Sequence, residues 1–323
     1  MSSVVAGYLK MAALAVVAVV VVGCRDQATA IGKIPQFTAA AATNAFKETE
    51  EFVALGSRAA GSEGARLAAQ YLCDRIEALV GEGARIESFE DDTPYGVRTF
   101  HNVIVELAAA HASAPRIVLL SHFDTKRDIP GETAENPFVG ANDSGSSTGL
   151  LLSLAELFSS SGEGLACHVM FAFLDGEECA IGYSDRDGLH GSRHLAAKLR
   201  REGVAIKAVI LADMIGDSDL HLEIPRNSTP ELRLLALKCA ERLELRDKVS
   251  LGRGFVLDDH QPFLDVGYAA IDLIDFKFGS APGLNDYWHT MEDTMDKLSV
   301  ESFEVTGRLI TAMMAELVET GRD

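Results

Sequence analysis

Short apolar runs alternate with longer amphipathic stretches along most of the chain. The apolar runs are rich in Val, Ile, Leu, Ala and Phe, and they predict six strands at residues 101–107, 116–122, 168–174, 207–213, 219–224 and 268–274. Apolar residues at helical spacing predict helices at residues 41–54, 63–80, 146–160, 190–202, 230–244 and 299–319. This alternation indicates βαβ units. It predicts an α/β fold, a three-layer α/β/α sandwich with a central mixed, mostly parallel sheet.

Acids and histidines lie where several of these strands end. The run FAFLDGEE ends on Glu177 and Glu178, and two other strands end on His122 and Asp213. Because open α/β sheets bind ligands at the carboxyl ends of their strands, we expect these side chains to face one site. Two adjacent carboxylates repel each other and are costly to desolvate unless a cation or a proton separates them. We therefore expect one of the pair to bind a metal and the other to carry a proton.

Loops between the predicted elements hold further candidates. The segment GANDSGS carries Asp143, LDDHQPF carries Asp258, and WHTMED carries His289. A single Asp at such a place is usually a helix cap or a turn residue. Six such coincidences in one chain instead favour a shared site. Imidazole and carboxylate together suit zinc, and an open coordination position makes such a site catalytic.

Length and charge limit the alternatives. The chain has 323 residues, and after residue 40 it shows no internal repeat and no linker rich in Pro, Gly or Ser, so we expect one catalytic domain at 41–323. It carries 29 basic and 48 acidic residues, a net charge of −19. That balance argues against nucleic acid or anionic lipid as the main partner. An acidic surround favours a substrate with a free amine.

The N-terminal segment has the features of a targeting signal. Lys10 is its one positive charge, an apolar stretch follows from Met11 to Val22, and VVGC ends on Cys24. This resembles the lipobox of bacterial lipoproteins. The resemblance implies a signal peptide at 1–23 and a lipid on Cys24, and we expect residues 24–40 to tether an exported protein to a bacterial membrane. An ordinary secretory signal or an uncleaved anchor remains the alternative.

At the strand-end motifs the chain resembles the zinc aminopeptidase superfamily and, within it, the animal-type glutaminyl cyclases, over about residues 41–320. The motifs SHFD, NDSGS, GEE, DMIG and HTMED belong to the whole superfamily. Three features are typical of the cyclases. They are the long segment between the paired acids and GSRHLA, the Lys126 of SHFDTK, and the double Asp followed by His in LDDHQPFL.

The resemblance implies a complete site. Its members would be the zinc ligands Asp143, Glu178 and His289, the catalytic acids Glu177, Asp213 and Asp258, and the pocket residues Trp288, Tyr183 and Lys126. Glu177 would be the general acid/base, with Asp213 and Asp258 as a hydrogen-bonded acid pair behind it. Two positions depart from the family. Tyr183 replaces a Trp, and Ser121 replaces one cysteine of the mammalian disulfide.

The implied activity is that of a glutaminyl-peptide cyclotransferase with one zinc ion, which converts N-terminal glutamine of peptides or proteins to pyroglutamate and releases ammonia. Two alternatives stay open. In a two-zinc aminopeptidase, His122 and Asp213 would bind a second zinc and Asp143 would bridge the ions. A lipid-anchored binding protein that had lost its chemistry would be expected to lack a ligand or Glu177, and neither is missing.

Overall fold

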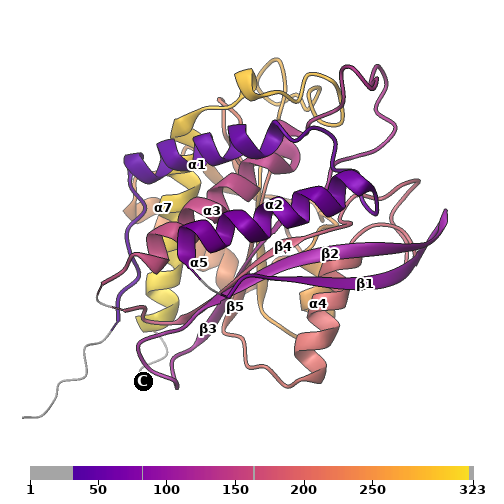
Figure 1. The fold of residues 1–323 in the computed structure, drawn as a ribbon. Coiled ribbons are helices and arrows are strands. Elements are labelled where there is room, and N and C mark those ends of the chain that lie inside the picture. Colours follow the sequence, from indigo (N-terminus) through magenta and orange to yellow (C-terminus); the bar gives the residue numbers. More distant parts are fainter. Residues whose placement is uncertain (1–31, 82, 163, 320–323) are drawn as a thin grey trace, which may run out of the picture. The chain divides into compact units, whose positions relative to one another are not determined.

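A single eight-stranded sheet forms the centre of the computed structural model, which describes residues 32–81, 83–162 and 164–319 (Figure 1). Its strand order is β1-β2-β4-β3-β5-β8-β6-β7. The strands are β1 (Arg85–Thr93), β2 (Gly96–Leu107), β3 (Arg116–His122), β4 (His168–Leu174), β5 (Ala208–Asp213), β6 (Leu222–Ile224), β7 (Val249–Leu251) and β8 (Ala270–Ile274).

The four central strands β4, β3, β5 and β8 are parallel. Their register pairs His122 with Leu174 and Asp213 with Ile274, so the carboxyl ends of these strands meet at one edge of the sheet. The strands β2 and β1 add antiparallel on one side, and β6 adds antiparallel to β8 on the other. The sheet is therefore mixed with a parallel centre, as predicted.

Helices cover both faces of the sheet. They are α1 (Ala39–Val53), α2 (Glu63–Val80), α3 (Ser147–Ser159), α4 (His190–Arg201), α5 (Pro230–Arg242), α6 (Gln261–Asp265) and α7 (Val300–Glu319). The core on one face joins the strands to α1, α2, α3, α5 and α7, and the core on the other face joins them to α4 and α6 (Figure 1). This arrangement is the predicted three-layer sandwich.

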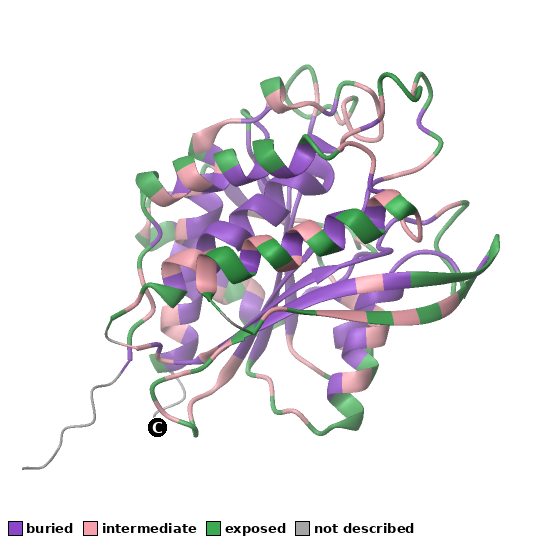
Figure 2. Ribbon diagram, viewed as in Figure 1, coloured by how far each residue is buried: buried purple, intermediate pink, exposed green. Residues whose placement is uncertain are grey.

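The parallel strands are buried on both sides. In β3, Ile117 and Leu119 belong to the core under α1–α3, whereas Val118 and Leu120 belong to the core under α4 and α6. Figure 2 shows the central strands and the inner faces of the helices as buried. Parallel strands covered on both faces read as continuous apolar runs, which explains why these segments were recognisable in the sequence.

The described part of the domain starts earlier than residue 41. Phe37 is buried, and its ring lies so close to Gly307 that a Cβ there would come within 2.3 Å of it. The backbone of Lys33 bonds to Gly164, and α1 begins at Ala39 with Thr38 as its N-cap. The segment from residue 32 to residue 40, predicted as tether, is therefore packed on the domain.

The predicted signal peptide at 1–23, Cys24 and the first part of the tether lie outside the described residues. Among the residues that the structure describes, no helix is both long and apolar enough to cross a membrane.

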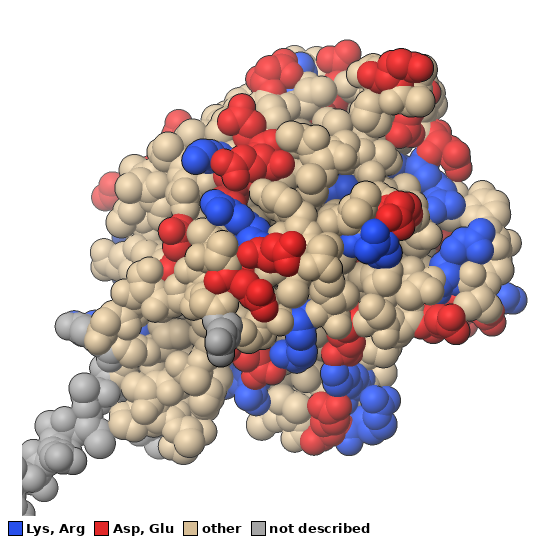
Figure 3. All heavy atoms as spheres, in the orientation of Figure 1, with Lys and Arg blue, Asp and Glu red and all other residues tan. Residues whose placement is uncertain are grey.

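Acidic and basic side chains are interspersed on the face seen in Figure 3. On α2, Arg66 lies 2.6 Å from Glu63, and on α1, Lys47 lies 3.4 Å from Glu51. Exposed pairs of this kind contribute between about 0 and 1 kcal/mol each, so the core rather than these pairs stabilises the fold.

Candidate metal and catalytic site

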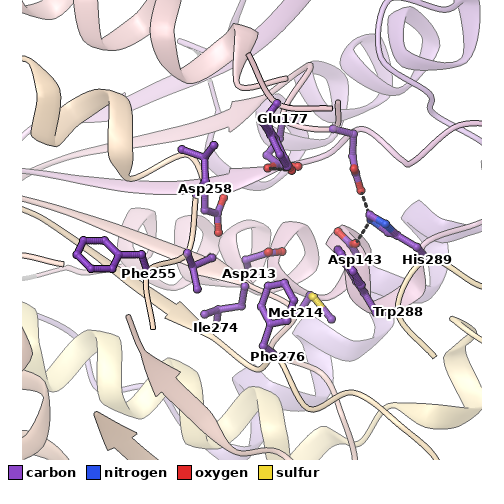
Figure 4. A pocket seen from close by; sticks show the side chains of 14 residues that line it. Asp143, Glu177, Asp213, Met214, Phe255, Asp258, Ile274, Phe276, Trp288 and His289 are labelled. Carbon is purple, nitrogen blue, oxygen red and sulfur yellow. Dashed lines mark hydrogen bonds and ion pairs between the residues drawn. The ribbon is translucent and has the colours of Figure 1, made fainter. Parts of the chain in front are cut away.

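A cavity of about 340 Å³ opens at the carboxyl ends of the parallel strands (Figure 4). Eight of the nine residues assigned to the site from the sequence line it: Asp143, Glu177, Glu178, Tyr183, Asp213, Asp258, Trp288 and His289. Six further lining residues were missed, although they flank the recognised motifs: Met214, Phe255, Val256, Leu257, Ile274 and Phe276. The strand-end prediction therefore located the cavity correctly and missed much of its apolar wall.

Asp143, Glu178 and His289 converge at one end of the cavity. The Nε2 atom of His289 lies 2.9 Å from Glu178 Oε1 and 3.3 Å from Asp143 Oδ2 (Figure 4). One ligand atom from each residue lies within 4.8 Å of the other two. Two buried carboxylates and one imidazole are a donor set that suits zinc, and three protein ligands leave a fourth position open. The residues present therefore fit a catalytic metal.

The electrostatics of these three residues also favour a bound cation. Burial alone would lower the pKa of His289, but the carboxylates of Asp143 and Glu178 raise it to about 9. Burial and the neighbouring Asp143 raise the pKa of Glu178 despite the favourable contact with His289. A cation between these groups would relieve the repulsion between the two carboxylates.

Lys126 lies behind Glu178 and is not among the residues that line the cavity, contrary to the prediction. Its ammonium lies 3.2 Å from Glu178 Oε2 and donates a hydrogen bond to the carbonyl oxygen of Cys179 at 2.7 Å. A buried carboxylate needs a counter-charge, and Lys126 supplies it on the oxygen that faces away from His289. Lys126 therefore orients Glu178, one of the proposed ligands, from outside the cavity lining.

Other buried groups hold the ligand loops. The backbone N–H groups of Asn142 and Asp143 donate to the carboxylate of Asp293 at 2.6 and 3.1 Å. The carboxylate of Asp124 accepts hydrogen bonds from the backbone N–H groups of Glu177 and Glu178, both at 3.1 Å. These bonds fix the directions in which the proposed ligands point.

Arg58 is a supporting residue that the sequence did not reveal. Its side chain is fully buried, and it donates to the carbonyl oxygens of Phe123, Val139 and Gly140 at 2.8, 2.8 and 3.3 Å. The guanidinium therefore joins the end of β3 to the loop that leads to Asp143. Burial lowers the pKa of Arg58 to about 10, which still leaves it charged at neutral pH.

The residues of the two-metal alternative also lie together. The Nε2 atom of His122 is 3.1 Å from Asp143 Oδ1 and 3.3 Å from Asp213 Oδ1. Ligand atoms of these three residues lie within 4.8 Å of one another. His122 itself does not line the cavity. The arrangement of side chains is thus compatible with either metal count.

Glu177 points into the cavity beside the proposed metal ligands (Figure 4). Its Oε1 accepts a hydrogen bond from the hydroxyl of Tyr183 at 2.7 Å. Burial raises the pKa of Glu177 well above the usual range, opposed by the charge of His122 and reinforced by Glu178 and Asp258. A buried carboxyl that takes up a proton readily suits general acid–base catalysis.

Asp213 and Asp258 point toward one another on the cavity wall, where the predicted acid pair was expected (Figure 4). Burial and the neighbouring Asp213 raise the pKa of Asp258 well above its usual range. A third carboxyl, that of Asp272 on β8, lies behind Asp258, with one oxygen of each residue within 4.8 Å of the other. This third acid was not predicted as a site residue, because it lies inside an otherwise apolar strand and not at a strand end.

Aromatic side chains also line the cavity. The ring of Trp288 lies 3.9 Å from that of His289 and 5.2 Å from that of Phe276, measured between centroids. The ring of Tyr183 lies against Gly188, where a Cβ would come within 2.6 Å of it. Gly188 also has a φ of +81°, so both space and backbone favour glycine there. Tyr183 thus provides the flat face that the sequence predicted.

The family model of peptidase family M28 matches residues 102–314, from β2 into α7. The chain therefore belongs to peptidase family M28, which confirms the resemblance to the zinc aminopeptidases. The family prediction rested on motifs that contain the proposed ligands and the paired acids, and all of these motifs lie inside the matched range.

Individual relatives are named glutaminyl-peptide cyclotransferases, a narrower class than the family. The chain is 30% identical over 292 residues to a glutaminyl-peptide cyclotransferase of Bos taurus, which covers 79% of this chain and 77% of the relative. It is 28% identical over 323 residues to a glutaminyl-peptide cyclotransferase of Boiga irregularis, which covers 89% and 85% of the two chains.

Solved structures agree in fold. The glutaminyl cyclase of an Acidobacteriales bacterium superposes with a TM-score of 0.79 and 33% sequence identity, covering 88% of this chain and 96% of its own. A Zn-dependent exopeptidase from Parabacteroides distasonis superposes with a TM-score of 0.75 at 20% identity, covering 87% and 99%. At that identity the second likeness shows the fold alone, so the fold by itself does not separate a cyclase from an exopeptidase.

Proposed function

We propose that this protein is a glutaminyl-peptide cyclotransferase, which converts the N-terminal glutamine of peptides or proteins to pyroglutamate and releases ammonia. The observation that carries the proposal is the placement of Glu177 beside the convergent set Asp143, Glu178 and His289, at one apolar-walled cavity. The names of relatives at 30% and 33% identity support the same activity.

The cavity suits a folded glutamine side chain. Its volume of about 340 Å³ lies at the lower end of the range for small-molecule sites, about 300–1,000 Å³. Trp288, Phe276 and Ile274 offer apolar surface against which the methylene groups of the substrate can pack. Because the reaction is intramolecular, holding the α-amine against the side-chain amide carbon supplies much of the acceleration.

The reaction needs one proton to move between two nitrogens. The α-amine nitrogen forms a bond to the side-chain amide carbon, and the bond from that carbon to its own amide nitrogen breaks. The attacking nitrogen loses one proton, and the departing NH₂ group gains one and leaves as ammonia. We assign this transfer to Glu177, whose carboxyl lies in the cavity and whose raised pKa favours uptake of the proton.

We further propose that Asp143, Glu178 and His289 hold a single zinc ion. A zinc ion bound there would polarise the amide oxygen and stabilise the negative charge that develops on it. The chemistry of the donor set and the membership of family M28 support this assignment. Lys126 contributes through its ion pair with the second oxygen of Glu178.

A two-zinc aminopeptidase is the second candidate, because His122 and Asp213 lie within ligand distance of Asp143. The two functions differ in their products. We expect a peptide with N-terminal Gln to become a pyroglutamyl peptide with release of ammonia, and a matched peptide with N-terminal Leu to stay intact. Release of a free amino acid from either peptide would instead support the aminopeptidase. The Glu177→Gln variant, assayed in parallel, corrects for spontaneous cyclisation.

We also propose that the enzyme is exported and held to a bacterial membrane by a lipid on Cys24. The support is the sequence alone, in which a small residue directly precedes this cysteine at the end of an apolar stretch. Cys24→Ser is expected to move the protein from the membrane fraction to the soluble fraction. An unchanged distribution would favour an uncleaved apolar anchor.

A further inference from the structure

A second buried cluster lies behind the cavity wall, away from the proposed zinc ligands. One oxygen each of Asp258 and Asp272 and a ring nitrogen of His260 lie within 4.8 Å of one another. Asp258 lines the cavity, whereas His260 and Asp272 do not, and both are 0% exposed. Adjacent carboxyl groups buried this deeply require a cation or a proton between them.

The proton on the ring of His260 is placed by Asn227. The side-chain oxygen of Asn227 accepts from the backbone N–H of Val256 at 3.1 Å, and its Nδ2 donates to the carbonyl oxygen of Val256 at 2.8 Å. This pair of bonds fixes which way the amide points. The same Nδ2 lies 2.9 Å from His260 Nε2. Nδ2 also lies 2.9 Å from Gln261 Oε1, so its two hydrogens face three acceptors. Because Nδ2 offers no acceptor, a proton on Nε2 would face a donor, and we therefore assign the ring proton to Nδ1.

The Nδ1–H group of His260 faces Asp272. It lies 3.8 Å from Asp272 Oδ2 and has no hydrogen-bond partner among the residues that the structure describes. A nitrogen that carries a proton does not bind a metal, so this tautomer argues against a metal ion in the cluster. Burial lowers the pKa of His260 to about 4, so the ring is neutral at working pH and offers no cation. With a metal ion and a charged imidazole both disfavoured, a proton shared between Asp258 and Asp272 is the remaining way to separate their charges.

We propose that Asp272 is a positioning residue for the reaction: as a neutral acid it donates a hydrogen bond from Oδ1 to Asp258, while its Oδ2 faces the Nδ1–H of His260. The other side of Asp258 is already held, because its Oδ1 accepts from the backbone N–H of Asp259 at 2.6 Å. Asp258 Oδ2 has no other donor in the described part of the chain. The donor from Asp272 completes the set and fixes the carboxyl of Asp258 on the cavity wall.

Electrostatics support this protonation state. Burial, followed by the carboxyls of Asp258, Asp213 and Asp259, raises the pKa of Asp272 well above its usual range. The consequence for catalysis rests on the proposed function. A carboxyl held from behind presents a fixed acceptor toward Asp213 and the substrate amine, so loss of the donor should lower kcat more than it changes KM.

Two substitutions of similar size separate this role from others. In Asp272→Asn the amide NH₂ can donate to Asp258 and the amide oxygen can face His260, so the proposed contacts survive without an ionisable group. We expect kcat within about threefold of wild type. Asp272→Leu removes the donor, and we expect kcat to fall by about tenfold or more with KM and zinc content little changed. A merely structural role would not lower kcat in Asp272→Leu while leaving it nearly unchanged in Asp272→Asn.

Several outcomes would overturn the proposal. An equal loss of kcat in Asp272→Asn and Asp272→Leu would mean that an ionised carboxylate is needed at this position, as in a metal ligand or a proton carrier. Full activity in the Asp272→Leu variant would mean that Asp272 does not act through Asp258. Bound metal in excess of one ion per chain, lost specifically in Asp272→Asn, would identify the cluster as a metal site.

A measurement on the wild-type enzyme covers the case in which Asp272→Leu does not fold. Nitrogen-15 NMR of labelled histidine, with His260→Gln to assign the signal, reports the tautomer directly. We expect His260 to stay neutral with its proton on Nδ1 from about pH 5.5 to about pH 9. An Nε2–H tautomer or a titrating ring would refute the arrangement. This readout does not depend on activity, so failure of the proposed function would remain distinguishable from failure of this inference.

Discussion

The hydroxyl of Tyr183 donates a hydrogen bond to Oε1 of Glu177 at 2.7 Å. Donation to the ionised carboxylate favours that form, so the bond opposes part of the rise that burial gives to the pKa of Glu177. Tyr183, in the long loop after the paired acids, thus contacts the proposed proton carrier directly.

Tyr183→Phe keeps the flat ring and removes the hydroxyl. We expect kcat to fall about three- to tenfold with little change in KM, which corresponds to the loss of one hydrogen bond. The acidic limb of the kcat profile should move to higher pH, because the pKa of Glu177 rises when its ionised form loses a donor. Steady-state kinetics across pH test this. Tyr268→Phe is the matched control, since that hydroxyl donates to Val204 far from the cavity; an equal effect in both variants would contradict the assignment.

Glu177→Gln should abolish most of the turnover without loss of metal. General acid–base catalysis contributes about 10²- to 10⁴-fold, so we expect kcat to fall by at least about 10². Gln keeps the size of the side chain and can still meet Tyr183, but it cannot carry the proton. Zinc content per chain, measured on the same sample, should match wild type. Persistent activity with normal zinc would show that another group transfers the proton.

Zinc binding should release a proton from His289. In the metal-free protein the pKa of His289 is raised to about 9, so the ring is protonated at neutral pH and must lose its proton to ligate zinc. Below that pKa, the apparent zinc affinity is therefore expected to rise about tenfold per pH unit from this residue. Competition with a coloured chelator at several pH values measures the slope. His289→Ala should lose both stoichiometric zinc and activity, and zinc retained by this variant would exclude His289 as a ligand.

His122→Ala distinguishes the two metal counts. For one zinc held by Asp143, Glu178 and His289, we expect full zinc content and a loss of kcat below about tenfold, because His122 contacts Asp143 and Asp213 without ligating the ion. In a two-zinc enzyme His122 is a ligand, and its removal would lower both metal content and activity severely. Metal analysis and kinetics on one preparation separate these results.

Much of the site was predictable because its parts are short, contiguous motifs at strand ends. The carboxyl ends of β3, β4 and β5 are brought together by parallel register, which follows from the apolar runs themselves. The edge strand β1 was missed for the opposite reason. Its sequence RIESFEDDT alternates acids with apolar residues and is only half buried, so it contains no apolar run to recognise.

The supporting residues were not predictable from local pattern. Arg58 is defined by carbonyl groups that lie more than sixty positions away along the chain, and a lone Arg in a loop carries no sign of that burial. Asp272 interrupts an apolar strand, and only the folded structure shows Asp258 and His260 beside it. Lys126 was expected in the pocket but turns to Glu178, because that buried carboxylate needs a counter-charge.

The most direct test is a zinc titration of the metal-free enzyme, with the products from a peptide that begins with Gln followed by mass spectrometry. We predict that activity rises to a plateau at one equivalent of zinc, and that the product is the pyroglutamyl peptide with an intact peptide bond and one ammonia released per turnover. Release of free glutamine, or activity that continues to rise toward a second equivalent, would contradict the one-zinc cyclase and support the aminopeptidase.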